Sequence, residues 1–127
     1  MESHMDKELD PNGAGQHTPG AKLDAGKPRP WLCISGFALA LEAVAEVTTK
    51  GAVKYTPNGW MKVPAGRERY MEAFGRHMLA LAKGETFDAD TGCRHKAQMI
   101  WNLLAALELE LQENTATAVK DSWNEGE

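Results

Sequence analysis

Apolar residues recur at the spacing of an amphipathic helix in three stretches of the chain. The first stretch runs from Gly36 to about Val53, the second from about Arg67 to Lys83, and the third from about Cys93 to Glu113. The residues between them are rich in Gly, Pro and Asn, which mark turns, and they show neither an internal repeat nor the alternation of a β-strand. The pattern therefore predicts an all-α fold, a small helical bundle.

The expected helix ends rest on single residues. Ser35 stands just before the first helix, where a hydroxyl can accept a hydrogen bond from a free backbone N–H. Gly84 follows the second helix and is its natural stop, because glycine adopts the left-handed conformation that ends many helices. We therefore expect Ser35 to cap the first helix and Gly84 to terminate the second.

The third helix is unusual because its middle, from Met99 to Leu109, is apolar nearly all round. Such a helix is buried on more than one side. In a chain this short the second covering surface is most simply another copy, so we expect a homodimer or homotetramer. His95, Gln98 and Asn102 form a polar stripe along the same helix, and these groups need hydrogen-bond partners.

The segments on either side of the helical domain lack this pattern. Residues 1–19 are expected to be poorly ordered or to lie on the surface, and residues 1–5 include Ser3-His4-Met5, which is typical of a cloning remnant. The domain itself is expected to span residues 20–113. Residues 114–127 then form a C-terminal tail or a short terminal helix.

Composition narrows the functional classes. A chain of 127 residues supports one domain, and a net charge of −4 argues against a partner that is a nucleic acid polymer. No signal peptide and no apolar run of membrane-spanning length is present. The only two cysteines, Cys33 and Cys93, lack the spacing of a zinc site, so we expect free thiols, a cytoplasmic protein and no membrane partner.

Side chains able to hold a metal or a phosphate are concentrated between Arg69 and His95. The acids Glu85, Asp88 and Asp90 stand in the link between two helices. A helix-loop-helix hairpin brings them near the two imidazoles, and the whole set is Arg69, Arg76, His77, Glu85, Asp88, Asp90 and His95. Carboxylates with imidazole are ligands for Mg²⁺ or Mn²⁺, and guanidinium groups beside the cation suit a triphosphate. The alternative is that the acids are ordinary loop residues and His77 is a core histidine.

Other candidate groups lie outside this cluster. The turn from Gly20 to Pro30 carries Lys27 but lacks the glycine and lysine spacing of a P-loop, so it is either a ligand-covering loop or a solvated linker. In the loop from Lys54 to Gly66, Trp60 either stacks on a base or attaches the loop to the core, with Lys54 and Asn58 as polar partners for a ligand. Glu42 and Glu46, four residues apart, are second-choice metal ligands or a surface acidic strip.

Four short motifs in a fixed order resemble one known family. They are G-A-K-L-D-A-G-K-P (20–28), G-A-x-K-Y-x-x-N-G-W (51–60), R-Y-x-x-A-x-x-R-H (69–77) and G-E-x-x-D-x-x-T-G-x-x-H (84–95). Over about Gly20 to Leu111 the chain resembles the phage dATP/dGTP diphosphohydrolases of the MazZ type, small relatives of the MazG-like all-α nucleotide pyrophosphohydrolases. It differs from the broader MazG-like pattern, E-x-x-E and E-x-x-D on consecutive helices, because its third helix opens with His95 and Gln98.

The resemblance implies a cation-dependent enzyme that splits a purine deoxynucleoside triphosphate between its α- and β-phosphates. The mechanism that fits this chain's own residues has Glu85 and Asp88 as the catalytic metal ligands, with His77, His95 or Asp90 as further ligands. Phosphate charge is neutralised by basic side chains, and the base or sugar meets polar and aromatic ones; these substrate contacts are Lys27, Lys54, Asn58, Trp60, Arg69, Arg76 and Gln98.

Two other functions use the same residues. In a non-catalytic nucleotide-binding or protein-interaction helical module, the basic residues hold a ligand and the acids are structural. In a nucleic-acid-binding protein they face a polymer, but the negative net charge disfavours that class. A metal requirement for turnover separates the enzyme from the module.

Overall fold

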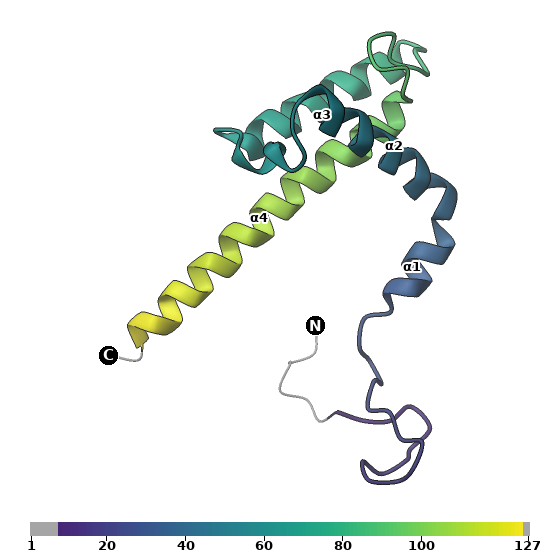
Figure 1. The fold of residues 1–127 in the computed structure, drawn as a ribbon, viewed down its shortest axis with the longest axis vertical. Coiled ribbons are helices and arrows are strands. Elements are labelled where there is room, and N and C mark those ends of the chain that lie inside the picture. Colours follow the sequence, from purple (N-terminus) through teal and green to yellow (C-terminus); the bar gives the residue numbers. More distant parts are fainter. Residues whose placement is uncertain (1–7, 126–127) are drawn as a thin grey trace. The chain divides into compact units, whose positions relative to one another are not determined.

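The computed structural model describes residues 8–125, and within them every regular element is helical. The elements are α1 (Pro30–Gly36), α2 (Ala38–Lys54), the short 3-10 helix η1 (Gly59–Lys62), α3 (Gly66–Ala82) and α4 (His95–Glu125) (Figure 1). No strand is found among the described residues, where pairing of the strand type is limited to one bridge between Phe87 and Arg94. The all-α class is therefore confirmed. The expected cloning remnant at residues 1–5 lies outside the described residues.

The chain divides into two compact units, one ending at Gly36 and the other beginning at Phe37. In the first, the Asp10 carboxylate accepts hydrogen bonds from the backbone N–H groups of Asn12 and Lys22, both at 2.7 Å. The N–H of Ala25 donates to the carbonyl of Leu9 at 2.9 Å. Backbone contacts rather than a hydrophobic core therefore organise this segment.

The predicted first helix, Gly36 to about Val53, corresponds to α2 (Ala38–Lys54). Helix α1 precedes it and was not predicted from the sequence. It begins at Pro30, and proline suits the first turn because its missing N–H has no acceptor there. Ser35 is not a cap: it lies inside α1, and its Oγ donates to the carbonyl of Leu32 at 3.4 Å. The second unit then opens with α2 at Ala38, preceded by Phe37, which offers no side-chain cap.

In the second unit, α3 packs along α4, and α2 also contacts α4. Most of the buried apolar residues are small: Ala80 of α3 and Ala97, Ala105 and Ala106 of α4 are buried, together with Val44 of α2. Small side chains allow the helix axes to approach closely, but they bury little apolar area. Among the described residues no large side chain falls below 2% exposure, so the core of the single chain is thin.

Helix α3 agrees closely with the second predicted helix. It ends at Ala82, and Gly84 follows in the left-handed conformation with φ +92°. The N–H of Glu85 donates to the carbonyl of Ala80, and that of Gly84 to the carbonyl of Leu81. These bonds satisfy carbonyls at the helix end, as expected for a glycine stop.

Helix α4 is longer than predicted, because residues 114–125 continue it to Glu125 and do not form an irregular tail. The side chains from Leu111 to Trp123 are exposed. Among the described helices none is by itself long and apolar enough to cross a membrane, and α1 and α2 approach that composition only when taken as a broken pair.

Candidate functional site

The loop between α3 and α4 is wound tightly around Asp88. The Asp88 N–H donates to the carbonyl of Cys93 at 2.8 Å, and the Asp88 carbonyl accepts the N–H of Gly92 at 2.7 Å. Gly92 has φ +74°, a conformation that suits glycine, and the N–H of His95 closes the loop on the carbonyl of Thr86 at 3.0 Å. The loop backbone therefore determines where the Asp88 carboxylate stands.

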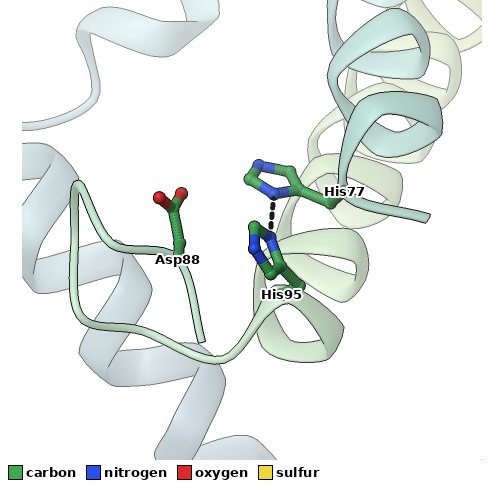
Figure 2. Close-up of side chains that lie close together, drawn as sticks. All are labelled: His77, Asp88 and His95. Atoms are coloured by element: carbon green, nitrogen blue, oxygen red, sulfur yellow. Dashed lines mark hydrogen bonds between the residues drawn. The ribbon is translucent and has the colours of Figure 1, made fainter. Parts of the chain in front are cut away.

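Asp88 meets two imidazoles that come from two helices. His77 lies on α3 and His95 is the first residue of α4 (Figure 2). Each of the three residues offers one ligand atom, and these atoms lie within 4.8 Å of one another. The two Nδ1 atoms are 2.9 Å apart and share a hydrogen bond. The three side chains are buried or half-buried, and together they could hold a cation.

The local environment perturbs two of these groups. Burial lowers the pKa of His77 below its usual 6.5, and the charges of His95 and Arg76 lower it further, against the opposing charge of Asp88. Burial raises the pKa of Asp88, but hydrogen bonds from Asp90 and Gln98 and the two imidazoles outweigh it, so the pKa is lowered overall from 3.8. At neutral pH the cluster thus presents a charged carboxylate and a neutral His77, the protonation states that bind a metal.

Comparison with known proteins identifies the chain at the family level. The family model described as dATP/dGTP diphosphohydrolase, N-terminal, matches residues 17–119. The chain belongs to this family. No curated protein and no solved structure matches it. The match confirms the family resemblance seen in the motifs, whereas the phage origin and the relation to MazG-like enzymes stay predictions.

The family match covers the whole second unit up to residue 119, including His77, Asp88 and His95. All other residues predicted for the site also fall inside the matched range. The family's name associates the domain with dATP and dGTP, and it describes an N-terminal part of such enzymes.

Around the three-residue cluster of this family member, a second set of polar side chains contacts the ligand candidates. The Gln98 Nε2 donates to Asp88 Oδ2 at 3.2 Å, and Gln98 is itself buried. Asn102 does not belong to this set, because its Nδ2 donates to the backbone carbonyl of Gln98 at 2.8 Å, one turn earlier on α4. Glu85 Oε2 lies 3.8 Å from the His95 Nε2, beyond hydrogen-bond distance but within range of an ion pair. Such partners orient metal ligands in many proteins.

Two of the predicted ligands stand apart from the group that the structure brings together. Glu85 lies beside the Nε2 of His95, and Asp90 forms an ion pair with Lys54 at 3.7 Å. Both carboxylates are more than half exposed. Their direct role as ligands stays a prediction, and of the predicted set His77, Asp88 and His95 are the three that converge.

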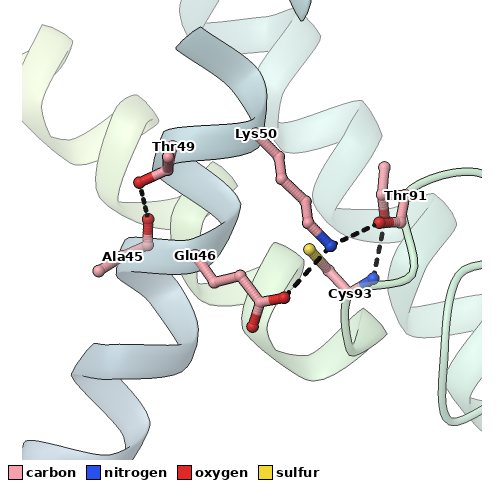
Figure 3. A network of polar contacts seen from close by, with 6 residues as sticks. All are labelled: Ala45, Glu46, Thr49, Lys50, Thr91 and Cys93. Carbon is pink, nitrogen blue, oxygen red and sulfur yellow. Dashed lines mark hydrogen bonds and ion pairs between the residues drawn. The ribbon is translucent and has the colours of Figure 1, made fainter. Parts of the chain in front are cut away.

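Helix α2 holds the same loop from the other side through Lys50, a residue that the sequence pattern did not single out. Its Nζ donates to the carbonyl of Thr91 at 2.9 Å and pairs with Glu46 at 3.2 Å (Figure 3). The Glu46 contact is the main reason that the pKa of Lys50 is raised. Nearby, the Cys93 N–H donates to the Thr91 Oγ1, and the Cys93 side chain is buried. Glu46, a second-choice metal ligand, thus forms an ion pair with Lys50.

The aromatic candidate Trp60 is part of a packed cluster. Its ring meets those of Tyr70 and Trp101 edge to face, with centroids 6.2 and 5.8 Å away. The Tyr70 hydroxyl donates to the carbonyl of Trp60 at 2.7 Å. These contacts attach η1 to α3 and α4, the second of the two roles foreseen for Trp60. Asn58, just before η1, has φ +60°, a conformation that asparagine tolerates better than most residues.

The predicted basic contacts fall in different places. Arg76 is the neighbour of His77 on α3, and Arg69 donates to the carbonyl of Pro64 at 3.3 Å, which ties α3 to the preceding loop. Lys54 reaches the site loop through Asp90. Lys27 belongs to the first unit, where it pairs with Glu8 at 3.3 Å. Of the predicted basic residues, Arg76 is therefore next to the cluster on α3, and Lys54 contacts the site loop.

Proposed function

We propose that the chain hydrolyses a purine deoxynucleoside triphosphate, dGTP or dATP, to the monophosphate and pyrophosphate with the help of a bound divalent cation. The observation that carries this proposal is the convergence of His77, Asp88 and His95 from α3, the loop and α4 within 4.8 Å. The family to which the chain belongs supplies the substrate class. The alternative is a nucleotide-binding module that has the same site but no turnover. The experiment below distinguishes this module from the enzyme.

The donor set fits a cation of the Mn²⁺ type. Two imidazole nitrogens and one carboxylate oxygen suit a first-row transition metal better than Mg²⁺, which prefers oxygen ligands. Three protein ligands leave positions for water and phosphate oxygens. The cation would supply Lewis-acid polarisation of the phosphate and a more acidic bound water. We therefore expect Mn²⁺ to support turnover better than Mg²⁺.

The chain's own groups would then divide the remaining work. Asp88 and the two imidazoles hold the charge at the centre of the site, while Arg76 and Lys54 neutralise phosphate oxygens. Water adds to the α-phosphorus, the bond from that phosphorus to the bridging oxygen breaks, and pyrophosphate leaves with the electron pair. The exposed Glu85 carboxylate, next to His95, takes the proton of the water. This assigns catalytic roles to both Glu85 and Asp88.

We also propose that the active form is a homodimer or homotetramer in the cytoplasm, where its nucleotide substrates are. One side of α4 packs on α3 and α2, but the side chains of Ile100, Leu103, Leu104, Leu107 and Leu111 are 38 to 50% exposed. A set of exposed aliphatic side chains this long on one helix is uncommon on a stable monomer. A second copy is the partner that is always present at matching concentration.

The test is a product analysis across nucleotides and cations. Purified protein is incubated with each of the four deoxynucleoside triphosphates and with GTP and ATP, with Mn²⁺, with Mg²⁺ or with a chelator. We expect monophosphate and pyrophosphate from dGTP or dATP, and no product with the chelator. Release of intact triphosphate, or of orthophosphate alone, overturns the proposal. Nucleotide binding that is unaffected by chelator, without turnover, supports the module instead.

A further inference from the structure

A buried amide contacts the carboxylate at the centre of the site. Gln98 lies one turn after His95 on α4 and is only 6% exposed. Its Nε2 donates to Asp88 Oδ2 at 3.2 Å, across ten residues of sequence. A buried amide needs partners because leaving it unpaired is costly. In this protein one of its donor hydrogens is used on Asp88.

The two oxygens of Asp88 receive different donors. Oδ1 accepts the backbone N–H of Asp90 at 2.9 Å, and Oδ2 accepts the Gln98 amide. With one donor fixed by the loop and the other by α4, rotation of the carboxylate about its last bond would break one of the two hydrogen bonds. Its remaining lone pairs are then held in a constant direction relative to His77 and His95.

We propose that Gln98 is a positioning residue, which orients the Asp88 carboxylate as a metal ligand, and that it does not contact the base or the sugar. The inference rests on the proposed cation site. It differs from the substrate contact expected for Gln98 because the amide is buried and committed to Asp88. Residues of this kind orient the side chains that bind the metal directly, and their loss typically weakens metal binding about 10- to 100-fold.

The two roles of Gln98 predict different measurements. A positioning residue alters the affinity for the cation alone, without nucleotide. A base contact alters the ratio of kcat/KM for dGTP to that for dCTP and leaves the affinity for the cation unchanged. We therefore measure both quantities on the same proteins, with Mn²⁺ binding followed by the loss of the free-ion signal in electron paramagnetic resonance.

The variant is Gln98→Met, which keeps the length and flexibility of the side chain but removes the amide. Gln98→Leu is the second variant. The matched control is Asn102→Leu, which removes another buried amide on α4, one that donates to the backbone carbonyl of Gln98 rather than to Asp88. A thermal melt by circular dichroism checks that each variant is folded.

We expect Mn²⁺ to bind Gln98→Met about tenfold more weakly than the unchanged protein, with the dGTP to dCTP ratio preserved. Asn102→Leu should melt at a lower temperature yet bind Mn²⁺ normally. Normal Mn²⁺ affinity in a folded Gln98 variant overturns the inference, and a changed base ratio then assigns Gln98 to the substrate. If the unchanged protein itself fails to bind Mn²⁺, the proposed cation site is what fails.

Discussion

Replacing Asp88 by asparagine tests the centre of the site with the smallest change of shape. The carboxylate accepts two hydrogen bonds, from the Asp90 N–H and from Gln98, on two different oxygens. An asparagine side chain has one acceptor oxygen and one NH₂ group, so one of those donors would face another donor. The substitution therefore removes a charge and a hydrogen bond together.

The structure sets the magnitude of the two effects. Losing one hydrogen bond to a charged group costs about 1.5–3 kcal/mol when buried, and about half of that at the half-buried Asp88. About 1 kcal/mol lowers the melting temperature of a domain of this size by roughly 4 °C. Because a folded domain is stable by about 5–15 kcal/mol, the variant stays folded at 25 °C. Loss of a ligand charge should nevertheless lower turnover by about 10²-fold or more.

Thermal melts with and without Mn²⁺ separate these effects. Binding to the folded state alone adds about 2.7 kcal/mol of stability at a hundred times the dissociation constant, so the unchanged protein should melt at a higher temperature with Mn²⁺. The Asp88→Asn variant should lose most of that increase. Asp121→Asn, on the exposed C-terminal part of α4, is the control and should behave like the unchanged protein. An Asp88→Asn protein that binds Mn²⁺ and turns over normally refutes the assignment of the site.

Three further predictions follow from the same contacts. At saturating Mn²⁺, Glu85→Gln should lower turnover by about 10²-fold. Glu46→Gln should keep nearly full activity, because the Glu46 carboxylate is paired with Lys50 of α2. The reverse result places the metal on α2. The pKa of His77 is lowered in the folded protein, so as the pH falls below 6.5 the unfolded chain binds a proton at this residue before the folded protein does. The melting temperature should therefore fall as the pH drops from 6.5 towards the folded pKa. His77→Gln should make the melting temperature less dependent on pH, and an unchanged dependence contradicts the burial argument. Leu107→Arg on the exposed face of α4 should give a smaller particle by light scattering than the unchanged protein, and equal sizes would mean that this face is not the interface.

The parts of the fold that sequence predicted best are those decided locally. Helix α3 is predicted by the spacing of its own apolar residues, and its end by Gly84 just after it. Both the helix and its end agree with the structure. The expected cap at Ser35 was wrong because Ser35 suits a helix interior as well as a cap, and Pro30 begins a separate short helix, α1, that contains it. Residues 114–125 lack apolar periodicity, but extending an existing helix costs far less than starting one.

The site shows the same division between local and distant contacts. Residue type and order placed His77, Asp88 and His95 among the candidate ligands, because few side chains bind cations, but only the structure separates them from Glu85 and Asp90. The contact of Lys50 with Thr91 joins residues 41 positions apart, and no local pattern announces it. The commitment of Gln98 to Asp88 likewise depends on how α4 meets the loop. The roles of all five candidate ligands in binding a metal stay predictions.

The short contact between the His77 and His95 Nδ1 atoms has a consequence for how the site would bind and release a cation. One ring donates its hydrogen to the other, so the two Nδ1 atoms can both serve as ligands only after that hydrogen has moved. If His95 is the donor, the hydrogen can shift to its Nε2, which faces Glu85 Oε2 at 3.8 Å. Glu85 would then stabilise the new tautomer. A cation would replace the hydrogen bond between the two imidazoles, and no proton would be released to the solvent. Calorimetric titration with Mn²⁺ in buffers of different ionisation enthalpy should accordingly give the same heat at neutral pH.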